Sequence, residues 1–190
     1  MIKYSLNFRL WHWLNAFVIL GLLGTVFLRK TFLSWRANSE LLMQKLTEFD
    51  ISITAEQAKI LAKTIRAPMW EWHIILGYML AFLVLYRVVL MFTHAKEKLP
   101  FSELDTHKKG VQLLYYIFYL VTAFMAISGV VIHFYEALAL SKDMAHEIKE
   151  IHEAVYNYYL FFVPLHIAGV VIAELKDEKG LISSMIHGSK

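Results

Sequence analysis

Four runs of apolar residues alternate with polar segments along the chain. They cover about residues 10–28, 69–92, 111–134 and 155–175. Each run is long enough to cross about 30 Å of hydrocarbon as a helix that rises about 1.5 Å per residue. Because backbone groups in lipid must be hydrogen-bonded within their own segment, helices are the structure that suits such runs. The pattern predicts an all-α fold, an integral membrane four-helix bundle.

The polar segment 29–67, between the first two runs, is long enough to form structure of its own. Apolar residues recur at helical spacing from Leu41 to Phe49, and Thr54-Ala-Glu-Gln57 has the pattern of a capping box that opens a second short helix. We expect this second helix to stop at Pro68. The segment is predicted to be a helical extramembrane loop within a single domain of residues 1–190. It either covers lipid or the bundle, or docks a partner.

Composition supports a membrane protein and excludes several chemistries. Hydrophobic residues make up 58% of the 190, charged residues 18%, and the mean hydropathy is +0.49, whereas about a quarter of the residues of a soluble domain are charged. The absence of cysteine excludes disulfides, thiolate catalysis, iron–sulfur clusters and covalently attached c-type haem. No basic run suggests nucleic acid. The predicted loops carry nine Lys and Arg on each side of the membrane, so charge alone gives no orientation.

Four of the nine histidines share a geometry in the predicted spans: His12, His73, His152 and His166. The 14 residues from His152 to His166 rise about 21 Å and return to within about 40° of the same helix face. Because neighbouring helices run antiparallel, His12 falls level with His166, and His73 with His152. Facing imidazoles at two depths are the arrangement that two bis-His haem b groups need.

Other readings of the histidines stay open. A zinc site fits less well because no carboxylate or thiolate joins either pair within the spans, and a proton pathway calls for acidic residues that the spans lack except at their margins. His133 ends the third span and is a substitute ligand for the haem on that side. The remaining histidines are expected to be solvated or interfacial: His94, His107, His146 and His187.

Further residues of the spans fit a bound porphyrin. Arg87 follows His73 by 14 residues, which places it about 21 Å along the same helix stripe, at the depth of the His12 and His166 pair. An arginine inside lipid pairs with an anion such as a haem propionate, or else snorkels to the interface. Gly77 and Gly169 each lie about one turn from a histidine, where a missing side chain admits either a porphyrin or a packed helix.

At these positions the chain resembles the bacterial cytochrome b561 and nickel–iron hydrogenase cytochrome b proteins, with formate dehydrogenase gamma subunits as relatives. The resemblance lies in Arg9-Leu-Trp-His12-Trp13-Leu-Asn-Ala16, in His73-Ile-Ile-Leu-Gly77-Tyr78 followed by Arg87, in Ser128-Gly129, in His152 to His166, and in the tail Gly180-Leu-Ile-Ser-Ser-Met-Ile-His-Gly188. It implies a di-haem protein of the bacterial inner membrane with both termini cytoplasmic. From the first motif we also count Arg9 among the cofactor-binding residues.

The resemblance further implies electron transfer between the quinone pool and a periplasmic redox protein or dehydrogenase subunit. Bis-His ligation leaves no open iron position, which favours one-electron transfer over oxygen chemistry. We expect the haem of His73 and His152 to serve the periplasmic side, and that of His12 and His166 to serve quinone on the cytoplasmic side. Residues that can bind the quinone headgroup near this second haem are Lys108, Lys109 and Gln112.

Two other functions remain, and whether the chain is an enzyme stays open. A free-standing superoxide:quinone oxidoreductase fits the basic residues Arg29, Lys30 and Arg36, which can steer an anion toward the outer haem. A haem-free membrane anchor or sensor needs none of the histidine ligands.

Overall fold

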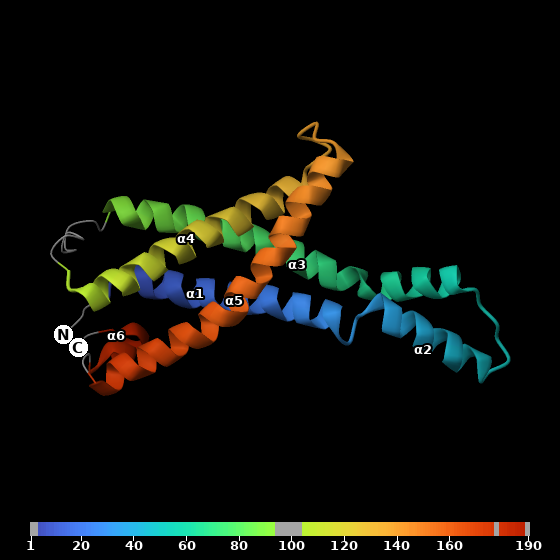
Figure 1. Ribbon diagram of the computed structural model, residues 1–190, viewed down its shortest axis with the longest axis horizontal. Coiled ribbons are helices and arrows are strands. Elements are labelled where there is room, and N and C mark those ends of the chain that lie inside the picture. Colours follow the sequence, from blue (N-terminus) through green and yellow to red (C-terminus); the bar gives the residue numbers. More distant parts are fainter. Residues whose placement is uncertain (1–3, 94–103, 177–178, 189–190) are drawn as a thin grey trace. The chain divides into compact units, whose positions relative to one another are not determined.

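The computed structural model describes residues 4–93, 104–176 and 179–188, and all of its regular structure within these ranges is helical (Figure 1). The helices are α1 (Leu6–Lys30), α2 (Trp35–Thr47), α3 (Ala55–Thr93), α4 (Thr106–His133), α5 (Lys142–Lys176) and α6 (Leu181–His187). Four of them, α1, α3, α4 and α5, are long and apolar enough to cross a membrane. The all-α membrane fold predicted from the apolar runs is confirmed.

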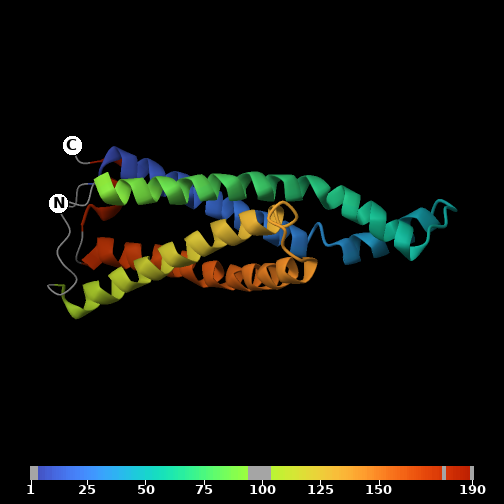
Figure 2. The ribbon, with the colours of Figure 1, turned by 90° about the horizontal axis from the view of Figure 1, so that it is seen from above.

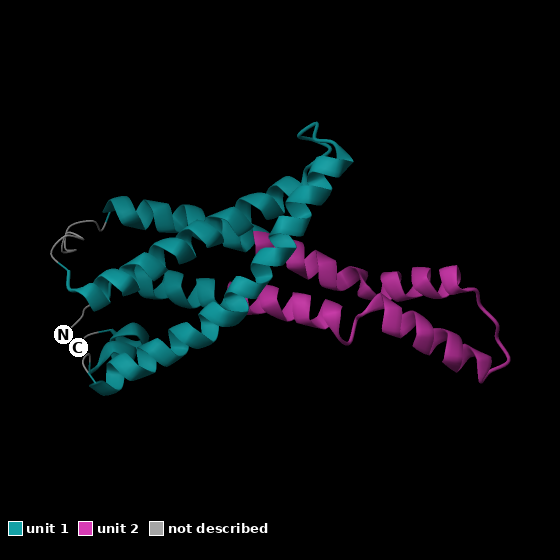
Figure 3. Cartoon of the chain, in the orientation of Figure 1, with its two compact units in different colours: residues 1–17, 78–190 teal, residues 18–77 magenta. Residues whose placement is uncertain are grey.

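The chain forms two compact units (Figure 3). The first contains residues 1–17 and 78–190, and therefore holds the start of α1, the second half of α3, and all of α4, α5 and α6. The second contains residues 18–77, which cover the end of α1, the whole of α2 and the first half of α3. Parts of all four membrane-length helices thus meet in the first unit, which is the bundle.

Aromatic stacking and a buried hydroxyl pair hold α4 against α5 in the first unit. The rings of Phe118 and Phe162 stack with centres 4.7 Å apart, and the Tyr159 hydroxyl donates to Oγ1 of Thr122 over 3.0 Å. Both hydroxyl groups are buried, so each supplies the partner that the other needs in an apolar interior. Many large apolar side chains, among them Phe82 and Phe161, point outward, as a lipid-facing surface requires.

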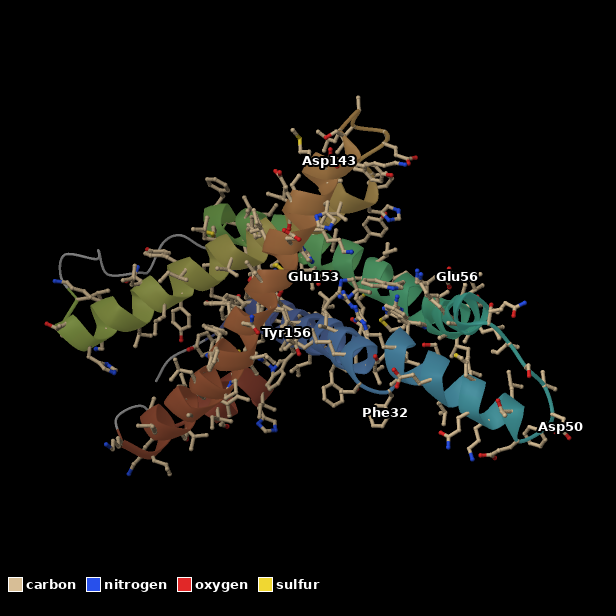
Figure 4. The ribbon with its side chains drawn as sticks, turned by 45° about the vertical axis from the view of Figure 1, so that its right-hand side comes forward. Phe32, Asp50, Glu56, Asp143, Glu153 and Tyr156 are labelled. Atoms are coloured by element: carbon tan, nitrogen blue, oxygen red, sulfur yellow. The ribbon has the colours of Figure 1, made fainter. Side chains whose placement is uncertain are left out.

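The start of α5 differs from the sequence prediction. The predicted span begins near residue 155, but the helix begins at Lys142, after the turn that joins it to α4 (Figure 2). The Ser141 hydroxyl accepts the backbone N–H of Met144 over 3.1 Å, and Asp143 stands in the first turn (Figure 4). A hydroxyl cap and an acidic first turn both stabilise a helix N-terminus, which explains the early start.

The second unit confirms the predicted capping box. The backbone N–H of Thr54 donates to the Gln57 side chain over 2.8 Å, and the N–H of Gln57 donates to the Thr54 hydroxyl over 3.2 Å. Asp50, in the turn that joins α2 to α3 (Figure 4), has a positive φ of 57°, a conformation that aspartate tolerates better than most residues. The helical extramembrane segment is therefore α2 together with the first turns of α3.

The prediction that Pro68 ends a helix is wrong, because Pro68 lies inside α3. Proline removes one backbone hydrogen bond and crowds the preceding turn, which weakens a helix without always ending it. The residues on both sides are strong enough helix formers to continue through it, since the capping box fixes the start and the apolar span follows at once. The extramembrane helix and the second span are consequently one continuous helix.

A short terminal helix, α6, is anchored by a carboxylate that the apolar pattern does not reveal. The two carboxylate oxygens of Glu174 in α5 accept the backbone N–H groups of Gly180 and Ile182, each over 2.8 Å. These N–H groups stand at the N-terminus of α6, where they have no partner within the helix. Gly180 has a φ of 88°, which suits glycine and lets the chain reverse direction between α5 and α6.

Replacing Glu174 with alanine is expected to loosen the start of α6. Loss of the carboxylate leaves the N–H groups of Gly180 and Ile182 without their acceptor, so hydrogen–deuterium exchange at these amides should accelerate. Glu150→Ala, which removes an exposed carboxylate from the same helix, should leave it unchanged. Equal exchange rates in wild type and Glu174→Ala would show that the carboxylate does not hold α6.

Candidate functional site

Two of the predicted histidines face each other in the first unit. His12 lies in the second turn of α1 and His166 in the second half of α5, and their ring centres are 6.1 Å apart with an angle of 70° between the ring planes. Helix register alone predicted that these residues fall at one depth. The structure adds that both side chains point into the same space.

Neighbouring aromatic rings orient this pair. The Phe162 ring, one turn before His166 in α5, stacks almost parallel to its imidazole, with centres 5.8 Å apart and an interplanar angle of 7°. His12 lies 5.3 Å from the ring of Trp13, whose indole N–H donates to the Met185 carbonyl in α6. Stacking restricts rotation of the His166 ring, and the tryptophan ties the first turns of α1 to the C-terminal helix.

The other two histidines each contact a hydroxyl group through Nδ1. Nδ1 of His152 lies 2.7 Å from the Ser128 hydroxyl of α4, and a Cβ at Gly129 would meet the same ring at an ordinary 3.5 Å. In the second unit, Nδ1 of His73 lies 2.7 Å from the Thr25 hydroxyl of α1. His152 belongs to the first unit and His73 to the second, so each is described in its own surroundings.

Arg87 is buried in an aromatic cage, with only 8% of its surface exposed. Its guanidinium carbon lies 5.0–5.2 Å from the ring centres of Phe8, Trp11 and Tyr119, and Nη2 donates to the Tyr119 hydroxyl over 3.1 Å. The Trp11 indole N–H donates to the Leu83 carbonyl, one turn before Arg87. The guanidinium is therefore enclosed within the first unit, and its buried Nε has no hydrogen-bond partner among the described residues.

Arg9 binds the C-terminal helix. Its Nη2 donates to the Ile186 carbonyl over 2.7 Å and its Nε to the Met185 carbonyl over 3.3 Å. Gly188, with a φ of 78°, leaves room for this guanidinium, because a Cβ there would collide with Nη1. Arg9 thus fastens the last turn of α6 to α1, and its predicted contact with a cofactor stays a prediction.

The remaining predicted residues lie in open surroundings. A Cβ at Gly77 or Gly169 would meet no heavy atom within 4 Å, so close helix packing does not explain these glycines.

At the start of α4, Asp105 accepts the backbone N–H of Lys108, which holds the pKa of that carboxyl below its usual value. Gln112 donates to the Tyr116 hydroxyl over 2.6 Å. Lys109 stands in the same first turns, and the role of these residues toward quinone stays a prediction.

The other histidines do not join the facing pair. His133 contacts the rings of Tyr78 and Phe134 at 5.8 Å and 4.8 Å, and His146 lies 3.6 Å from Glu150 on the exposed side of α5. His107 and His187 lie near helix ends, and His94 is outside the described residues. Within the described ranges, no three His, Cys, Asp or Glu side chains gather as a metal cluster, so a zinc site gains no support.

Membrane-length helices with imidazoles directed into their bundle define the class of this chain as an all-α integral membrane protein with a histidine-lined interior. A family model described as prokaryotic cytochrome b561 matches residues 3–188, and the chain belongs to this family. No curated protein and no solved structure matches it. Membership makes the chain a haem b membrane protein of electron transfer.

The facing pair has the dimensions that a bis-imidazole iron site needs. A metal–nitrogen bond of about 2.0 Å on each side, with about 1.1 Å from each nitrogen to its ring centre, separates two ring centres by about 6.2 Å. The observed separation of His12 and His166 is 6.1 Å. The angle between the ring planes imposes no conflict, because each ring can rotate about its own metal–nitrogen bond. The spacing of His12 and His166 is therefore compatible with a pair of histidines that would hold haem iron.

Sequence reasoning missed several residues of this site. The Thr25 and Ser128 hydroxyls belong to apolar runs in which threonine and serine are unremarkable, and the rings around Arg87 come from α1 and α4, far from it in sequence. Phe162 alone carried a usable signal, since it stands one turn before His166 on the same helix face.

Arg87→Gln is expected to destabilise the bundle. The change removes the cation from three rings, and each cation–π contact stabilises by about 0.5–2 kcal/mol. We expect a loss of about 1–3 kcal/mol, seen as a lower unfolding temperature in detergent. Tyr119→Phe keeps the ring and removes only one hydrogen bond, so its effect should be smaller. An unfolding temperature unchanged by Arg87→Gln would refute a stabilising role for the cage.

Proposed function

We propose that this protein carries two bis-His haem b groups and transfers electrons between the membrane quinone pool and a periplasmic redox partner. One haem is ligated by His12 and His166, and the other by His73 and His152. The observation that carries the proposal is the 6.1 Å separation of the His12 and His166 ring centres, which suits two nitrogens on one iron. Two axial imidazoles give a haem that exchanges single electrons and has no open coordination position.

Support for the second pair comes from register and from local contacts. The register of antiparallel spans predicts that the starts of the second and fourth spans, which carry His73 and His152, fall at one depth. Each of these histidines has its Nδ1 next to a hydroxyl. A ligating histidine almost always uses its other ring nitrogen for such a hydrogen bond. Arg87, caged at the depth of the first pair, is the residue we assign to a haem propionate.

We further propose that the protein lies in the bacterial inner membrane with both termini cytoplasmic. In this orientation the α2 and α3 extension of the second unit is periplasmic and offers a docking surface to a redox protein or dehydrogenase subunit. The start of α4, with Lys108, Lys109 and Gln112, then lies on the cytoplasmic side. These side chains supply hydrogen-bond donors for a quinone headgroup.

A second function, superoxide:quinone oxidoreductase, is favoured by a basic cluster in the second unit. Arg36, Lys59 and Lys63 all lie within 4.6–6.0 Å of the Trp35 ring centre, and the Arg29 guanidinium lies 5.3 Å from that of Trp70. Converging cations raise the local concentration of a small anion. The reaction balances when two superoxide anions are oxidised to O2 and one quinone takes up two electrons and two protons.

Alanine substitution of each proposed ligand tests the leading function. His12→Ala, His73→Ala, His152→Ala and His166→Ala should each lower the haem content from two per chain to one, as measured by the pyridine haemochrome assay. His107→Ala and His146→Ala, which replace histidines outside the proposed pairs, should keep both haems. A variant of the first group that retains both haems would remove its residue from the ligand set.

Superoxide reduction separates the second function from the first. If the basic cluster steers superoxide, the double variant Arg36→Gln, Lys63→Gln should slow haem reduction by superoxide at least about threefold at low salt, and high salt should slow the wild type similarly. Lys45→Gln is the matched control, because this lysine of the same unit is paired with Glu48. Failure of superoxide to reduce the wild-type haem would exclude the oxidoreductase.

A further inference from the structure

In the membrane-length helices, the hydroxyl groups of Thr25 and Ser128 each have one acceptor to which they must donate their hydrogen. The Ser128 hydroxyl lies 2.7 Å from the Phe124 carbonyl of its own helix, and the Thr25 hydroxyl lies 2.6 Å from the Leu22 carbonyl of its own. A carbonyl oxygen can only accept. At these distances each hydroxyl must donate its hydrogen to the carbonyl, since two bare oxygens would repel each other.

Each hydroxyl then has only lone pairs left for its histidine. The Ser128 oxygen lies 2.7 Å from Nδ1 of His152, and the Thr25 oxygen lies 2.7 Å from Nδ1 of His73. Because the hydroxyl must accept in this contact, Nδ1 must carry the hydrogen and donate it. A neutral imidazole protonated at Nδ1 has its free lone pair on Nε2. Both histidines are therefore held in the tautomer that presents Nε2 to a metal.

His12 and His166, the facing pair in the first unit, have no hydroxyl acceptor of this kind among the described residues. Within the described part of the chain, the rings of His12 and His166 have ring contacts with each other, Trp13 and Phe162, and neither ring nitrogen has a hydrogen-bond partner. The four proposed ligands thus divide into two with a hydroxyl acceptor and two without. Donation from Nδ1 moves electron density onto the ring and makes Nε2 a more basic ligand.

We propose that Thr25 and Ser128 are positioning residues. Each sets the Nε2 tautomer of the histidine in its own unit, His73 or His152, and lowers the reduction potential of the haem iron which that histidine would ligate. The inference rests on the proposed function, because it needs each of these histidines to be a haem ligand. A more basic axial ligand stabilises ferric iron over ferrous iron. The two hydroxyl groups would therefore act on the potential through the histidines, without touching iron.

The test is a redox titration of the purified protein, followed by visible absorbance, in wild type, Ser128→Ala and Thr25→Val. Each variant removes one acceptor and should raise the equilibrium constant for reducing one haem by up to about tenfold, which is about 59 mV for a one-electron couple. The other haem should keep its potential. Ser128→Thr and Thr25→Ser retain a hydroxyl and should titrate like wild type.

Matched controls remove hydroxyl groups that bond a carbonyl of their own segment in the same way. These are Ser184→Ala, whose hydroxyl donates to Leu181, and Thr31→Val, whose hydroxyl donates to Phe27. Neither should change a potential. Loss of one haem in Ser128→Ala, but not in Ser128→Thr, also supports a positioning role, because the ligand then depends on the hydroxyl.

Unchanged potentials in both Ser128→Ala and Thr25→Val, with two haems retained, would overturn the inference and leave the proposed function standing. A wild-type protein without two haems, or His73→Ala and His152→Ala variants that keep both, would instead refute the proposed function itself.

Discussion

The facing of two imidazoles across a helical bundle is the interaction on which the account of this protein depends. His12 and His166 are brought together by packing in the first unit, where the stacked rings of Phe118 and Phe162 hold α5 to α4. Phe162 also lies against His166 and fixes the plane of its ring. A rotation of either helix by one residue, about 100°, would turn an imidazole out of the shared space. The packing that fixes the rotation of these helices therefore also fixes the relative position of the two imidazoles.

Lipid imposes the second constraint, because polar groups inside the membrane need partners within the protein. The Tyr159 and Thr122 hydroxyls bond each other, and the Ser128 hydroxyl bonds both a carbonyl and His152. The Arg87 guanidinium makes cation–π contacts with three aromatic rings and donates a hydrogen bond to one hydroxyl. Such groups give particular helix faces a fixed partner, whereas apolar side chains can face either lipid or a neighbouring helix. The polar contacts thus specify how the helices of the bundle meet.

The sequence was sufficient for features that depend on local pattern or on periodicity. The four spans, the capping box of Thr54 and Gln57, and the common depth of His12 and His166 follow from spacing alone. Pro68 was misjudged because its cost to the helix is smaller than the gain from the helical segments on either side. The anchoring of α6 by Glu174 and the cage around Arg87 were not predictable, since their partners are brought together only by tertiary packing. The ligand roles of the histidines remain predictions, as do the roles of the glycines and of the residues assigned to quinone.

The electron paramagnetic resonance spectrum of the oxidised, purified protein tests the central claim most directly, because it reports the axial ligands of each ferric haem. The account predicts two low-spin signals of equal intensity, as expected when every iron carries two imidazoles. A high-spin signal of comparable intensity, from a haem with an open or weakly held axial position, would contradict it, as would a protein that contains no haem.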